Sequence, residues 1–120
     1  MSTATATQTR KSLLETCIQH CFDCLRECES CGDACLSHDK AQMMTLCIKL
    51  CRDCADLCSL CLQFMFRNSE FHAHLCGVCA EACDRCAAEC AKHDQDDHCK
   101  RCAAACLRCA ESCRQMAIAK

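Results

Sequence analysis

The fold is decided by the stretch Cys17-Ile-Gln-His-Cys21-Phe-Asp-Cys24-Leu-Arg-Glu-Cys28-Glu-Ser-Cys31-Gly-Asp-Ala-Cys35. Its cysteines follow one another at intervals of four, three, four, three and four residues. This alternation averages about 3.5 residues, which is the period of the inward-facing seam of a bundled α-helix. We therefore expect the six thiols to lie in one line along one face of one helix.

The same alternation recurs three times further along the chain. The repeats consist of Cys47, Cys51, Cys54, Cys58 and Cys61, then Cys76, Cys79, Cys83, Cys86 and Cys90, and finally Cys99, Cys102, Cys106, Cys109 and Cys113. The sequence predicts helices near residues 12–36, 40–66, 69–92 and 96–116, with a flexible lead over residues 1–10. Because short connections make successive helices antiparallel neighbours, residues 11–120 are expected to form an all-α, up-down-up-down four-helix bundle with a cysteine-lined core.

Composition agrees with a small helical domain and argues against several kinds of partner. The 120 residues include 2 Gly and no Pro, so little interrupts a helix. A net charge of -2 and 3% aromatic residues do not suit nucleic-acid binding. The first ten residues lack an apolar signal segment, and no stretch is long and apolar enough to span a membrane. We therefore expect a cytoplasmic protein with reduced thiols.

A core made of cysteine is underfilled unless it holds something. A bundle centre normally carries Leu and Ile, and each Å³ of unfilled cavity costs about 24 cal/mol. A purely structural cysteine core is therefore a poor explanation of the pattern. Regular disulfides are a poor explanation too. The axes of facing helices lie about 8–10 Å apart, whereas the Cα atoms of a disulfide lie closer than about 7 Å.

Among metals, Cu(I) suits this core best. Each Zn²⁺ held by four thiolates leaves two negative charges, and the seam carries no Lys or Arg to balance them. Cu(I) is soft, prefers thiolates and accepts two or three of them, so one ion for each lost proton leaves the core neutral. If each thiolate bridges two ions, the capacity is roughly 20 ions per chain. A zinc or mixed-metal thiolate store is the alternative, and it predicts about five tetrahedral ions.

Two other classes of protein fit the pattern less well. Iron–sulfur proteins use cysteine runs such as C-x₂-C-x₂-C, and no such run occurs here. A thiol-redox enzyme needs a singular thiol of low pKa, usually at a helix N-terminus, whereas these cysteines form a uniform line within the helices. We therefore expect no catalysis.

The repeated CxxC and CxxxC steps resemble those of the bacterial copper storage proteins, and the resemblance covers residues 12–116. It implies a lumen in which all 21 cysteines bind Cu(I), homotetramers, and exchange with a copper chaperone or an apo-cuproprotein. It also implies a mouth of the lumen where His and Met admit copper. The residues that match this mouth are His38, Met43, Met44, His93 and His98.

The opposite end of the predicted bundle also carries Cu(I) donors. Met65, His72 and Met116 continue the cysteine seam there, at steps of three or four residues beyond the last cysteines. The resemblance leads us to expect a plainer, apolar plug at that end. This sequence departs from the expected family pattern at these three positions.

Overall fold

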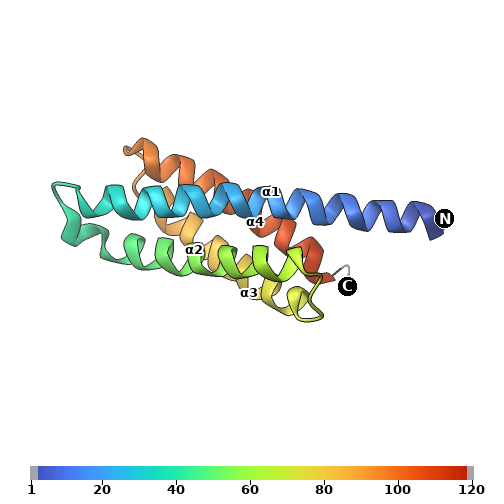
Figure 1. The fold of residues 1–120 in the computed structure, drawn as a ribbon. Helices are drawn as coiled ribbons and strands as arrows, with labels where there is room; N and C mark the ends of the chain where they lie inside the picture. The colour runs from blue at the N-terminus through green and yellow to red at the C-terminus, as the bar shows by residue number, and fades with distance from the viewer. Residues whose placement is uncertain (1–2, 119–120) are drawn as a thin grey trace.

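The computed structural model describes residues 3–118 and confirms the four-helix bundle (Figure 1). The helices are α1 (Thr3–Leu36), α2 (Thr45–Phe66), α3 (His72–Ala91) and α4 (Asp97–Ile118), with a short 3₁₀ helix, η1 (Ala41–Met44), before α2. Contacts join α1 to α2 and α4, and α3 to α2 and α4. Each helix therefore packs against two neighbours around a common axis. In the described part of the chain, no helix is long and apolar enough to cross a bilayer.

The cysteines occupy the centre of the bundle, as the alternation of their spacing predicts. All 21 are buried, and none has a side chain more than 1% exposed. Larger apolar residues flank the seam instead of filling it, because they fall at positions beside the inward stripe. Of these, Ile18, Leu25, Leu50 and Leu57 are partly buried against the cysteine core.

Helix α1 begins earlier than the sequence predicts. The predicted start lies near residue 12, whereas the helix extends back to Thr3 and includes residues where we expected a flexible lead. No Gly or Pro interrupts this segment, so no helix breaker stops the helix from extending beyond its packed part. Residues 1 and 2 lie outside the described part of the chain. In Figure 1 the N-terminal end of α1 projects past the other helices.

The other boundaries differ from prediction by a few residues. Residues 41–44, which we expected to open the second helix, form η1 instead, and α2 begins at Thr45. The tighter turns of η1 bring Met44 over the end of the core, where its side chain is 3% exposed. Helix α3 begins at His72 rather than near residue 69, and α4 runs on to Ile118.

Helix α2 ends in a turn that the sequence encodes in Asn68. This residue has φ 50°, in the left-handed region that Asn tolerates better than most side chains. The Asn68 N–H donates to the Met65 carbonyl at 3.1 Å, and the Ser69 N–H donates to the Phe64 carbonyl at 2.9 Å. This pair of bonds is a Schellman motif, which satisfies the last carbonyls of the helix and turns the chain toward α3.

Candidate metal centre

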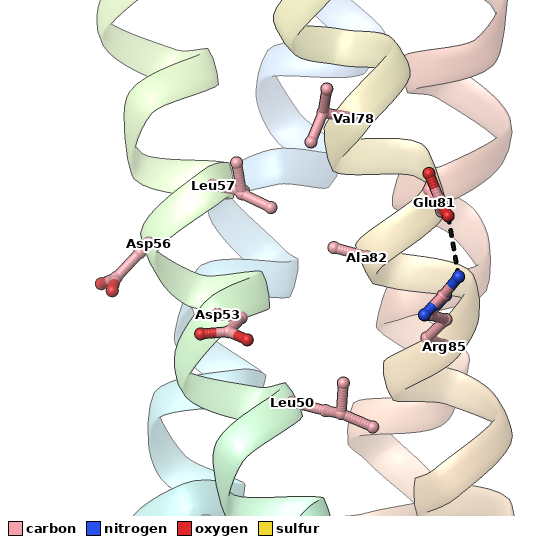
Figure 2. A pocket seen from close by; sticks show the side chains of 8 residues that line it. All are labelled: Leu50, Asp53, Asp56, Leu57, Val78, Glu81, Ala82 and Arg85. Carbon is pink, nitrogen blue, oxygen red and sulfur yellow. Dashed lines mark hydrogen bonds and ion pairs between the residues drawn. The ribbon is translucent and has the colours of Figure 1, made fainter.

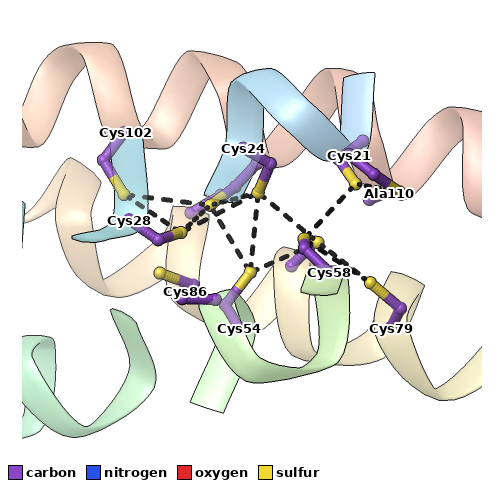
Figure 3. Close-up of a cluster of buried hydrophobic side chains, with 14 of the residues drawn as sticks. Cys21, Cys24, Cys28, Cys54, Cys58, Cys79, Cys86, Cys102 and Ala110 are labelled. Carbon is purple, nitrogen blue, oxygen red and sulfur yellow. Dashed lines mark hydrogen bonds between the residues drawn. The ribbon is translucent and has the colours of Figure 1, made fainter. Parts of the chain in front are cut away.

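The cysteine sulfurs lie close to one another along the bundle axis, and Figure 3 shows part of this network. Cys54 illustrates the geometry: its Sγ lies 3.4 Å from that of Cys83, 3.6 Å from that of Cys24 and 4.0 Å from that of Cys106. These contacts join four different helices. All 21 cysteines are free thiols, and their separations are far longer than the roughly 2.05 Å of a disulfide bond.

The sulfurs gather into four-membered groups whose ligand atoms lie within 4.8 Å of one another. Four of these groups are Cys24–Cys28–Cys54–Cys106, Cys24–Cys58–Cys83–Cys109, Cys28–Cys86–Cys102–Cys106 and Cys31–Cys51–Cys90–Cys102. Among these four groups, Cys24, Cys28, Cys102 and Cys106 each belong to two. A sulfur that serves two groups must bridge, so the lumen suits a connected thiolate cluster better than separate one-ion sites.

The buried charge limits which metal this lumen can hold. Among the described residues, the only buried polar or charged side chains are Glu89 and Ser112. No buried Lys or Arg is therefore available to offset the two negative charges of each Zn²⁺–Cys₄ unit. A monovalent ion that replaces one thiol proton leaves the lumen neutral, which favours Cu(I).

Burial and mutual hydrogen bonding set the protonation of the thiols. Burial raises the pKa of the Cys35 thiol to about 11 and that of the Cys99 thiol to about 12. Hydrogen bonding with Cys102 raises the pKa of Cys28, while hydrogen bonding with Cys106 lowers the pKa of Cys102. Lumen thiols such as Cys35 and Cys99 are therefore protonated at neutral pH, and a metal that binds them must displace their protons.

His98 joins the outermost cysteines at the end of the bundle that holds the α1–α2 and α3–α4 connections. Its Nδ1 lies 3.3 Å from Cys31 Sγ and 3.5 Å from Cys99 Sγ. Together with Cys35 these residues form one of the candidate metal groups. The structure thus brings one imidazole of the predicted mouth into contact with the thiols near this end of the lumen.

The remaining residues of the expected mouth surround a cavity of about 240 Å³ at this end. Its lining includes His38, Met43, Met44 and His93. His38 Nε2 lies 3.4 Å from Asp96 Oδ2, and His93 Nε2 lies 3.1 Å from Glu89 Oε2. The four predicted mouth residues therefore do come together, with two of the imidazoles held by carboxylates.

The three donors at the opposite end also lie at the core. Met65 and Met116 are buried, with side chains 2% and 7% exposed. His72 is partly buried, and its Nδ1 is buried without a hydrogen-bond partner among the described residues. His72 and Met116 line a cavity of about 290 Å³. This end is consequently not the plain apolar plug that the resemblance implies.

The polar contacts at the two buried polar side chains, Glu89 and Ser112, were not predicted from the sequence. Glu89 is 8% exposed and holds both His93 and, at 3.2 Å, Lys92. Its spacing of four residues from His93 is a helical pairing signal that could have been used. The second contact, 2.5 Å between His20 Nδ1 and Ser112 Oγ, joins α1 to α4 and has no signal in the sequence.

Comparisons with known proteins agree with this site. The profile of a family described as "Copper storage protein" matches residues 10–118. An uncharacterized cysteine-rich protein, YhjQ, of Bacillus subtilis (strain 168) is 45% identical over 103 residues, which are 86% of this chain and 94% of that protein.

The structure of the Cu(I)-bound copper storage protein BsCsp3 has a TM-score of 0.83 and 44% identity, over 88% of this chain and 98% of that one. A cytosolic copper storage protein from Streptomyces lividans, solved with five coppers, has a TM-score of 0.88 and 31% identity. This match covers 92% of this chain and 96% of that one. The profile match and these identities extend over nearly the whole chain. The chain therefore belongs to the copper storage protein family.

Proposed function

We propose that this protein is a high-capacity store for Cu(I), which the thiolates of its 21 cysteines hold inside the bundle. The observation that carries the proposal is the continuous network of buried, free thiols, many of them shared between neighbouring four-sulfur groups. Shared sulfurs allow each thiolate to bridge two ions, which sets the capacity at roughly 20 ions per chain. The Cu(I)-bound structure of BsCsp3 supports the choice of metal.

Storage needs no catalytic group, and we propose that the protein is not an enzyme. The lumen thiols are all buried, and none of them stands alone as an exposed nucleophile. A cytoplasmic location, as in the relative from Streptomyces lividans, fits thiols that must stay reduced. Copper would then be exchanged at the His/Met mouth with a copper chaperone or an apo-cuproprotein.

Self-association is supported by apolar side chains that the bundle leaves on its surface. Figure 2 shows Leu50 and Leu57 of α2 facing Val78 and Ala82 of α3 across a groove, with the ion pair Glu81–Arg85 on the α3 side. The groove has a volume of about 410 Å³, and Val78 is 53% exposed. We propose that this face belongs to a homotetramer interface.

Light scattering of the wild-type protein should show a tetramer, and the variant Leu57→Glu should dissociate it. A monomeric wild-type protein would contradict this proposal.

An anaerobic titration of the reduced protein with Cu(I), in competition with a chromogenic Cu(I) chelator, tests the storage function. We expect the chelator to stay colourless until roughly 20 equivalents have been added. Colour after about five equivalents, together with binding of about five Zn²⁺, would favour the zinc alternative. The titration thus separates a copper store from a store of tetrahedral ions.

A further inference from the structure

At the α2–α3 end of the bundle, each helix carries one residue a single turn beyond the cysteine that lies nearest to that end. These are Leu14 before Cys17, Met65 after Cys61, His72 before Cys76, and Met116 after Cys113. Residues three or four apart share a helix face, so this layer stacks on the outermost layer of thiols. Three of its four members carry a donor atom that binds Cu(I), and both thioethers are buried.

The donor atoms in this layer are available for binding. His72 and Met116 line the same cavity, and the buried Nδ1 of His72 makes no hydrogen bond within residues 3–118. A buried nitrogen without a partner has lost its contact with water and gained none in return, and a bound ion would restore a partner. Imidazole and thioether are neutral, so they can take up Cu(I) without releasing a proton and hold it less tightly than thiolates do. These properties suit a site that passes ions on.

The charge around this cavity differs from the charge at the other end of the bundle. Arg10 and Lys11 are the charged residues in its described lining, and both are exposed. At the His38 end, by contrast, Asp94 and Asp96 accompany the lysines. A basic opening repels a bare copper cation and attracts an anionic ligand. Small thiols that carry carboxylates are anions and also bind Cu(I).

We propose that His72, Met65 and Met116 form a Cu(I) transfer site through which a small anionic thiol withdraws copper from the lumen. The proposal rests on the storage function and assigns one direction of transfer to the α2–α3 end. The incoming thiol bonds to Cu(I) as a thiolate while a bond from Cu(I) to a lumen cysteine breaks. The proton of the incoming thiol passes to the departing cysteine, and copper remains Cu(I) throughout.

The first experiment compares withdrawal of copper by two thiols of opposite charge. The fully loaded protein is mixed anaerobically with glutathione, which is anionic, or with cysteamine, which is cationic, and the loss of bound copper is followed in time. In the double variant Arg10→Gln/Lys11→Gln, the rate with glutathione should fall by about tenfold at low salt, while the rate with cysteamine stays unchanged or rises. An equal change with both thiols, or no change with either, overturns the proposal.

The second experiment tests the donor atoms. In His72→Gln/Met116→Leu, withdrawal by either thiol should slow by about tenfold or more, on the scale of a weakened metal site, while capacity falls by no more than the one ion that this site holds. The control is His74→Gln, because His74 is exposed on the same helix. Withdrawal from His72→Gln/Met116→Leu at the wild-type rate contradicts the proposal. A failure of the storage function itself would be seen separately, because the Cu(I) titration would then show few copper ions bound to the wild-type protein.

A measurement on the wild-type protein makes the test independent of how the variants fold. The ring nitrogens of the 6 histidines can be followed by NMR while Cu(I) is added. We expect the His72 signals to shift as the lumen fills and those of His74 to stay in place. His72 signals that do not move up to saturation would overturn the proposal.

Discussion

Many lumen cysteines contribute a sulfur that several neighbours share, so the loss of one should reduce capacity without abolishing it. Cys54 contacts thiols on three other helices, and Cys54→Ser leaves those thiols in place. We expect capacity to fall by one or two ions and the bundle to stay folded, at a stability cost of about 1–3 kcal/mol for the buried hydroxyl. Copper titration and circular dichroism measure the two effects.

The matched control for Cys54→Ser is Ala55→Ser on the same helix. Ala55 is 1% exposed, so the control buries a hydroxyl without removing a sulfur. Its capacity should equal that of the wild type. Complete loss of copper binding in Cys54→Ser would contradict a distributed store.

The protonation of single thiols also predicts how the stability of the copper-free protein depends on pH. Burial raises the pKa of Cys35 and Cys99 from 9.0 to about 11 and about 12. A raised pKa means that the folded state keeps its protons longer than the unfolded state. This contribution to stability is complete below pH 9 and is lost as the pH rises through 11 to 12.

Thermal unfolding of the reduced, copper-free protein between pH 8 and pH 11 measures this loss. We expect the unfolding temperature to fall above pH 9, and to fall less steeply in the double variant Cys35→Ala/Cys99→Ala. An unfolding temperature that is flat from pH 9 to pH 11 would show that burial does not raise these pKa values.

At the scale of the elements, the ends of the helices decide how copper reaches the lumen. The mouth residues His38, Met44 and His93 lie on three different segments and meet at one cavity. We expect the triple variant His38→Gln/Met44→Leu/His93→Gln to load Cu(I) more slowly, while its capacity barely changes. Stopped-flow loading and equilibrium titration separate the two quantities, with His74→Gln as the control. A capacity reduced by half would make these residues storage ligands instead of a mouth.

The end of α2 gives a prediction about stability alone. Because Asn68 has φ 50°, Asn68→Val should destabilise the bundle by about 1–2 kcal/mol. Asn68→Gly should be close to neutral, since Gly adopts this conformation freely. Chemical denaturation of the copper-free protein measures both changes, and equal stability of the two variants would contradict the assigned turn.

The sequence predicted the helices and the core well, but it did not predict the details of the helix ends. The cysteine seam follows from a local spacing, so its burial could be derived without knowing how the helices pack. The contact of His98 with Cys31 and Cys99 depends on where α1 and α4 finish relative to each other. The same holds for η1 and for the start of α1, where no breaker marks the boundary that we expected near residue 12.

At the scale of the whole molecule, the bundle is a container about 56 Å long, including the projecting part of α1, with a core of thiols. A core of small side chains gives less apolar packing than a core of Leu and Ile, so bound copper should contribute to the stability of the fold. A lumen filled with Cu(I) explains why the core consists of small side chains and why no buried Lys or Arg accompanies it among the described residues. It also agrees with the membership in the copper storage protein family.

Whether the lumen holds the copper can be seen by anomalous diffraction of copper-loaded crystals, recorded on both sides of the copper absorption edge. We predict a row of copper peaks along the bundle axis, each between sulfurs such as those of Cys24, Cys54 and Cys83, with neighbouring ions sharing a thiolate. Copper confined to surface histidines, or a lumen of intact thiols without metal in a loaded crystal, would rule out storage in the lumen.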